Sequence, residues 1–416
     1  MIEYNRFVLP NGLRVIHHQD PDSTVVVLNT LFNVGARDEE SSRTGFAHLF
    51  EHLMFGGSKN VSSYDKSVER AGGSNNAFTN NEYTNYYITV PAENVETAFW
   101  LESDRMFLLD INDKSLEVQR GVVIEEFKQR CFSAPFGLLW HHVRSLVYKQ
   151  SPYRWPTIGE DISHIENATL EDVAAFYQKH YHPANAILCV AGQITLEETK
   201  ALCEKWYANI PSAGAVNLNQ YNPEPEQEER RFLSETDLSP NPAVFLVWRG
   251  PAFSNPDSAA LELFADLLGG SEISPLYVRL VKETALFNDA ACFYMRGVGE
   301  GLFMLYGILN DGKTQEEGEA ALLEVFQEAL SGKLFTERDM ERVKNKTTTA
   351  LLFEKASLIN RAQKLCYFEN LGHLEAVEEE NNQYREVSLH HMLNTATATF
   401  KQDKVSVLYY SPNQSA

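Results

Sequence analysis

The sequence of 416 residues predicts an α+β protein of two homologous domains, each an antiparallel-rich β-sheet covered by helices. Three observations carry this prediction. Segments of strand composition alternate with segments of helical spacing, a polar stretch with prolines divides the chain near its middle, and one apolar helical segment recurs in similar form in both halves. The predicted domains are residues 1–213 and 232–416, joined by a linker over 214–231.

The first half opens with strands and continues with a helix. The run 5–35 is rich in β-branched and apolar residues, and a Pro-Asn-Gly signal at residues 10–12 marks a turn inside it. From Gly45 to Phe55 the apolar residues follow helical spacing, and a glycine pair at 56–57 ends that helix. The elements expected next are a short helix over 64–71, a strand over 76–90, and helices over 95–107 and 114–130.

A segment of each half resembles the other. Residues 47–57 read AHLFEHLMFGG and residues 260–270 read ALELFADLLGG; when Phe50 is aligned with Phe264, Leu49 and Leu53 coincide with Leu263 and Leu267, and the two glycine pairs lie one residue out of step. Any apolar helix that ends in two glycines looks similar, but together with the central linker a duplicated fold is the better explanation. In the second copy Glu262, Ala265 and Asp266 stand where the first has His48, Glu51 and His52, so we expect chemistry in the first half only.

Charge and composition exclude several classes of function. The net charge of −21 argues against nucleic acid as a partner, because phosphate binding needs a basic surface. No apolar run approaches the roughly 18 residues of a membrane span, and the N-terminus lacks the pattern of a signal peptide. Five widely spaced cysteines without a CxxC motif indicate a reducing compartment. We therefore expect a cytoplasmic protein.

The strongest functional signal is the HxxEH sequence formed by His48, Glu51 and His52. On a helix, residues i and i+4 lie one turn apart on the same face, so the two imidazoles can hold one Zn²⁺ at ~2.0–2.1 Å each. Glu51 projects beside such an ion without being a ligand, and its carboxylate can take a proton from water. The alternative is a pair of half-buried histidines bridged to a carboxylate.

Catalytic zinc normally takes three protein ligands, so a third should come from another element. The segment 117–130 reads EVQRGVVIEEFKQR, and we expect Val118, Val122, Val123 and Phe127 to hold this helix in the core. Glu125 and Glu126 lie on the same helix. Acidic residues on helices are usually solvated, so the residues alone do not establish a third ligand.

Several motifs together resemble one peptidase family. They are HxxEH itself, NGLRV at 11–15, GFA at 45–47, GGSNNAFT at 72–79, EYTNYY at 82–87 and RGVVIEE at 120–126. The chain is similar to the inverzincin, or pitrilysin/insulinase-type, zinc metallopeptidases, especially to small bacterial members and to the beta-type subunit of the mitochondrial processing peptidase. The resemblance implies that Glu126 is the third zinc ligand and that Glu51 is the catalytic base of a zinc endopeptidase.

Two positions depart from the family pattern. Members often have a second glutamate seven residues before the third ligand, where this chain has Gln119, which can still form outer hydrogen bonds but brings no charge. Active members also carry an arginine and a tyrosine, seven residues apart, that hold the substrate carbonyl. The corresponding positions here are Val281 and Asn288. The resemblance implies that a homologous partner chain supplies this pair; a homodimer with a relocated pair is the alternative.

Residues 74–79 (SNNAFT) are candidates for substrate binding. They are polar and extended, and an exposed edge strand can pair with the backbone of a peptide. The residues predicted to do so are Asn76, Ala77, Phe78 and Thr79; an ordinary edge strand or loop is the alternative. The chain is thus predicted to be a zinc endopeptidase subunit for extended or unfolded peptides, with a non-catalytic structural or peptide-binding subunit of the same fold as the alternative.

Overall fold

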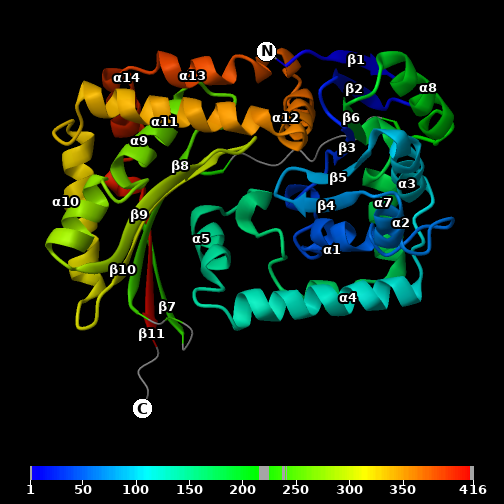
Figure 1. The fold of residues 1–416 in the computed structure, drawn as a ribbon. Coiled ribbons are helices and arrows are strands. Elements are labelled where there is room, and N and C mark those ends of the chain that lie inside the picture. The colour runs from blue at the N-terminus through cyan, green and yellow to red at the C-terminus, as the bar shows by residue number, and fades with distance from the viewer. Residues whose placement is uncertain (1, 215–223, 237–238, 240, 413–416) are drawn as a thin grey trace. The chain divides into compact units, whose positions relative to one another are not determined.

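The computed structural model describes residues 2–214, 224–236, 239 and 241–412 (Figure 1). The chain forms two compact units, each assembled from three stretches of sequence. Unit 1 comprises Met1–Lys128, Trp155–Tyr221 and Leu352–Glu379, and unit 2 comprises Gln129–Arg154, Asn222–Leu351 and Glu380–Ala416. Each unit contains one β-sheet covered by helices, which confirms the predicted α+β class.

The described part of unit 1 contains a six-stranded sheet in the order β1-β2-β6-β3-β5-β4. Neighbouring strands are antiparallel except β2 and β6, which are parallel. The strands are β1 (Asn5–Val8), β2 (Arg14–Gln19), β3 (Val25–Phe32), β4 (Ser74–Thr79), β5 (Thr84–Pro91) and β6 (Ala186–Gly192). β4 is therefore an edge strand, as predicted for residues 74–79.

Helices cover both faces of this sheet. Val26, Leu28 and Phe32 of β3 join the core with α1 and its neighbours, whereas Val27 and Leu31 are equally buried on the opposite face, where α12 packs across β2, β3 and β6. A sheet buried on both faces needs strands without exposed polar side chains, and β6 (AILCVAG) is buried throughout. The helices of unit 1 are α1 (Phe46–Leu53), α2 (Tyr64–Arg70), α3 (Val95–Phe107), α4 (Asp113–Phe127), α6 (Ile162–Glu166), α7 (Leu170–His180), α8 (Leu196–Tyr207) and α12 (Leu358–Asn370).

The single strand predicted over 76–90 is wrong, because two strands and a turn occupy this region. The side-chain oxygen of Asn80 accepts the backbone N–H groups of Glu82 and Tyr83 at 2.7 and 2.8 Å, which closes the turn between β4 and β5. An asparagine that bonds its own following backbone favours turns. The Asn-Asn pair at 80–81 was the available signal.

Within its described residues, unit 2 has a five-stranded sheet in the order β7-β11-β8-β10-β9. The pairing is antiparallel except between β7 and β11. The strands are β7 (Arg230–Thr236), β8 (Ala243–Gly250), β9 (Phe287–Met295), β10 (Gly301–Leu309) and β11 (Ser406–Pro412). The helices are α5 (Leu139–Val147), α9 (Asp257–Gly269), α10 (Gln315–Leu330), α11 (Glu337–Ala356), α13 (Glu380–Glu386) and α14 (Leu389–Thr399).

The predicted linker over 214–231 lies partly outside the described residues, which omit 215–223. Its described part has no regular structure until β7 begins at Arg230. The domain boundaries at 213 and 232 stay a prediction. No helix of the described residues is long and apolar enough to cross a membrane.

Candidate metal centre

Helix α1 carries both histidines and is fixed at its N-terminus. It begins after Gly45, whose φ of 89° lies in the left-handed region that favours glycine. The Glu39 carboxylate accepts the backbone N–H groups of Gly45 at 2.9 Å and Ala47 at 2.8 Å, two donors that the helix itself cannot satisfy. Burial raises the pKa of Glu39, and these two hydrogen bonds oppose the rise. The sequence analysis missed this role, although an acidic residue shortly before a helix was a usable signal.

Helix α4 brings the third side chain. Its N-cap Asn112 accepts the N–H groups of Lys114 and Ser115 at 3.0 Å each. Leu116, Val123 and Phe127 anchor its buried face. The prediction that Val118 and Val122 also lie in the core is wrong, because their exposed fractions are 54% and 45%. The buried face is narrower than the apolar pattern suggested, and Glu126 lies at its border with a side chain 19% exposed.

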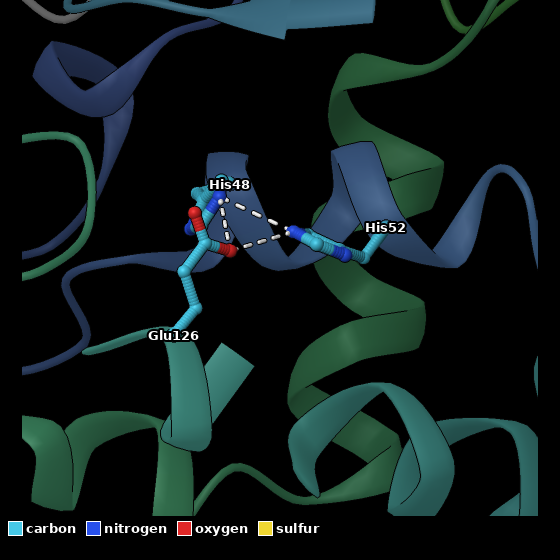
Figure 2. Close-up of side chains that lie close together, drawn as sticks. All are labelled: His48, His52 and Glu126. Atoms are coloured by element: carbon cyan, nitrogen blue, oxygen red, sulfur yellow. Dashed lines mark hydrogen bonds and ion pairs between the residues drawn. The ribbon is translucent and has the colours of Figure 1, made fainter. Parts of the chain in front are cut away.

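The structure brings His48, His52 and Glu126 together, as Figure 2 shows. The two Nε2 atoms lie 3.2 Å apart, and Glu126 Oε2 lies 3.4 Å from Nε2 of His48 and 3.2 Å from Nε2 of His52. Three tetrahedral zinc ligands at ~2.0–2.1 Å would be about 3.3–3.4 Å apart. The triangle therefore has the size that a tetrahedral zinc ion requires.

With Glu126 ionised, hydrogen bonds alone do not satisfy all three edges of this triangle. A carboxylate only accepts, and each imidazole nitrogen either donates or accepts. If both histidines donate to Glu126, two donors face each other across the His48–His52 edge; if one accepts, its lone pair faces the carboxylate. A cation at the centre satisfies all three lone pairs at once. Among the residues that the structure describes, this is the only group of three or more His, Cys, Asp or Glu whose ligand atoms all lie within 4.8 Å of one another.

Glu51 and Gln119, the other residues predicted for the metal centre, lie on the two helices that carry its candidate ligands. Glu51 is on α1, and its Oε2 accepts a hydrogen bond from the Thr79 hydroxyl at 2.6 Å. Gln119 lies on α4, and its side-chain amide nitrogen comes close to Gly56, which follows α1. A Cβ atom added to this glycine would lie 3.7 Å from that nitrogen. Their predicted roles, as base and as outer hydrogen-bonding partner of the ligands, stay predictions.

The predicted substrate residues Asn76, Ala77, Phe78 and Thr79 all lie on edge strand β4. The N–H of Ala77 donates to the side-chain oxygen of Asn76 at 2.8 Å, so this amide points away from β5. The ring of Phe78 contacts Tyr83 with centroids 5.8 Å apart. The contact of the Thr79 side chain with Glu51 was not predicted, and the separation of 28 residues offered no local signal for it.

The positions of the missing arginine and tyrosine lie in unit 2. Val281 is in a π-helical segment, Tyr277–Glu283, and Asn288 is an exposed residue of β9. The nearby guanidinium of Arg279 is 2.7 Å from the Glu328 carboxylate. Neither Val281 nor Asn288 supplies the positive charge or the phenol of the expected pair.

Comparisons with known proteins agree with this architecture. The profile of the insulinase family, peptidase family M16, matches residues 14–159, and the profile of the peptidase M16 inactive domain matches residues 167–347. The chain belongs to the M16 peptidase family. The first match contains HxxEH and RGVVIEE, and the second extends from residue 167 into α11.

Individual M16 relatives extend over nearly the whole chain. A zinc protease of Helicobacter pylori, PqqE, is 25% identical over 99% of this chain and 93% of its own length. The beta subunit of the mitochondrial processing peptidase of Saccharomyces cerevisiae is 24% identical over 83% of this chain and 77% of its own. A crystal structure of a protease from Helicobacter pylori superposes with a TM-score of 0.93 at 25% identity, covering 99% of this chain and all of that one.

Proposed function

We propose that this chain is the zinc-bearing subunit of a metalloendopeptidase that hydrolyses extended or unfolded peptides. The observation that carries the proposal is the triangle of His48, His52 and Glu126, whose edges of 3.2 to 3.4 Å fit the ligands of one zinc ion. Zinc bound there would polarise the substrate carbonyl and acidify water. The names of the M16 relatives, which include zinc proteases, support the choice of metal.

Glu51 is the proposed general base. It lies one residue before His52 on α1, and the triangle of candidate ligands is complete without it. Its carboxylate takes the proton of the attacking water and returns it to the leaving amine. The proton therefore moves through a side chain on the rigid helix that also carries two of the metal ligands.

Strand β4 is the proposed substrate site. The outer edge of β4 has no partner strand among the described residues, so an extended peptide can add to it. The peptide would compete with Asn76 for the outward N–H of Ala77. Main-chain pairing of this kind selects unfolded or extended substrates and tolerates many sequences.

A homologous partner chain is proposed to complete the site. With Val281 and Asn288 in place of the arginine and tyrosine, this chain lacks the donors for the developing oxyanion. We propose that the partner supplies them. Purification from the native source should recover a second chain of similar length; recovery of this chain alone with full activity would exclude the divided site.

The decisive variant for the proposed function is Glu51→Gln. It keeps the shape of the side chain and leaves all three ligands in place, so the assembled complex should still bind about one zinc per chain. Cleavage of an unfolded peptide should fall about 100- to 10,000-fold, the usual contribution of a general base. Unchanged cleavage would show that this chain is a non-catalytic subunit of the same fold.

A further inference from the structure

One hydrogen bond joins the proposed base to the proposed substrate strand. Thr79, the last residue of β4, donates its hydroxyl to Glu51 Oε2 at 2.6 Å. Both side chains are partly exposed, so the contact is within reach of solvent and of a bound peptide. We propose that Thr79 is a positioning residue, which holds the Glu51 carboxylate in the orientation from which it accepts the proton of water. The proposal rests on the proposed function of the metal centre.

A glutamate that acts as a general base needs such a contact to keep its carboxylate in one orientation. Its last torsion is broad and roughly two-fold, so the carboxylate of a partly exposed glutamate samples many orientations. A hydrogen bond to a charged acceptor is among the stronger kinds and fixes one of the two oxygens. Threonine suits this role because its β-branched side chain is stiff at χ1. The Thr79 hydroxyl is therefore already placed before substrate arrives.

The geometry of β4 lets this strand both hold Glu51 through a side chain and pair with a peptide through its backbone. Successive side chains of a strand point to opposite faces. Thr79 and Ala77 share the face that packs against α1, whereas Phe78 contacts Tyr83 on the other face. Both faces are thus used within unit 1, and the outer backbone edge of β4 has no partner strand among the described residues. A peptide that pairs with β4 would therefore lie along the same strand whose Thr79 holds Glu51.

Three variants test the role. Thr79→Val removes the hydroxyl and keeps the branched shape, and Thr79→Ser keeps the hydroxyl. The matched control is Thr30→Val, because Thr30 also donates to a glutamate, Glu102, at 3.1 Å, but does so in the core of unit 1. The assembled peptidase is assayed with an unfolded, quenched fluorescent peptide, and its zinc content is measured.

We expect Thr79→Val to lower kcat about 10- to 100-fold, the effect of a misaligned catalytic group, with KM changed less than about twofold and zinc retained. Thr79→Ser should recover most of the rate. Thr30→Val should lower the melting temperature and leave kcat and KM unchanged. A kcat for Thr79→Val within twofold of wild type, no recovery by serine, or an equal loss in Thr30→Val would each overturn the proposal.

Crystal structures of the zinc-free chain give a second measurement that does not depend on activity. The Glu51 carboxylate should be ordered in the wild type and in Thr79→Ser, and turned away or spread over several orientations in Thr79→Val. An unchanged Glu51 in Thr79→Val would refute the role of Thr79 even if kcat fell. A wild-type assembly that cleaves no peptide would instead refute the proposed function, and these structures would still decide whether Thr79 holds Glu51.

Discussion

Helices α1 of unit 1 and α9 of unit 2 carry similar sequences but differ in what balances their polar side chains. In α9, the Glu262 carboxylate accepts the Tyr384 hydroxyl at 2.7 Å and lies 3.5 Å from the Arg296 guanidinium. Asp266, on the same helix, lies 2.5 Å from the ammonium group of Lys346. Glu262 and Asp266 thus each have a cation supplied by another element of unit 2.

In α1 the residues at the corresponding positions are histidines, and their ring nitrogens face other atoms that carry lone pairs. The imidazoles of His48 and His52 face each other and the carboxylate of Glu126. A carboxylate beside an arginine or lysine forms an internal ion pair, whereas the carboxylate of Glu126 and the two imidazoles together form the proposed site of a cation from outside. The comparison shows that two helices of similar sequence can have different chemistry. The difference depends on the side chains that other elements place beside each helix.

The largest expected effect comes from removing the charge that completes the triangle. Glu126→Gln keeps the shape of the side chain but replaces a carboxylate ligand with a weak neutral one. Zinc affinity should fall more than about 100-fold, because even the outer partners of ligands are worth 10- to 100-fold. Competition with a chromophoric chelator measures it.

The neighbouring residue provides the control for this variant. Glu125 is exposed on the same turn of α4, and Glu125→Gln should leave zinc affinity unchanged. Equal affinities for wild type and Glu126→Gln would remove the distinction between the two helices. So would a loss of zinc in Glu125→Gln alone.

A smaller effect is expected in unit 2 when the Arg296 guanidinium beside Glu262 is removed. The Arg296 side chain is 8% exposed, and Arg296→Ala leaves the Glu262 carboxylate without its guanidinium. Burial already raises the pKa of Glu262, while Tyr384 and Arg296 oppose that rise. Breaking a fully buried ion pair costs about 3–5 kcal/mol. The Glu262 side chain is 39% exposed, so the cost of breaking this pair should be smaller. We therefore expect a loss of about 2 kcal/mol in urea denaturation, with zinc affinity unchanged.

An exposed arginine of the same unit is the control. Arg342 is 38% exposed and lies 4.0 Å from Asp339, so Arg342→Ala should cost less than about 1 kcal/mol. If both arginine variants lose the same stability, the Arg296 contact contributes no more than an ordinary surface pair. If Arg296→Ala instead loses zinc, the two units are not independent in their chemistry.

An effect of about the same size is expected from a pH dependence that belongs to unit 1. His180 is 2% exposed, and its ring lies 4.7 Å from that of Phe176, which stacks on Phe50 of α1. Burial, followed by the charges of Lys179 and His182, lowers the pKa of His180 to about 3. The unfolded chain therefore binds one more proton between pH 6.5 and 3, and stability falls as the pH falls through this window.

His180→Phe should remove this dependence. At pH 5 the wild type loses about 2 kcal/mol relative to pH 7 from this group, at 1.36 kcal/mol per pKa unit. Denaturation of the zinc-free protein at both pH values measures the difference, since zinc release would otherwise add its own proton uptake. An identical pH profile for His180→Phe would show that other groups loosen unit 1 in acid.

Local patterns in the sequence predicted helix α1, the i and i+4 placement of its histidines, and the helix that carries Glu126. They also predicted that residues 74–79 form an edge strand. They failed where neighbouring elements decide burial: Val118 and Val122 belong to an apolar pattern but lie exposed. They also failed at Asn80, whose side chain closes a turn inside a stretch of strand composition.

The sequence by itself determined which residue types are available to bind a metal and how two of them are spaced, because one turn of helix fixes that spacing. Only the tertiary structure decided that Glu126 reaches the same point as His48 and His52 and that Thr79 meets Glu51. These contacts join elements far apart in the chain. Their distances depend on how helices and strands pack, which no local pattern of residues specifies.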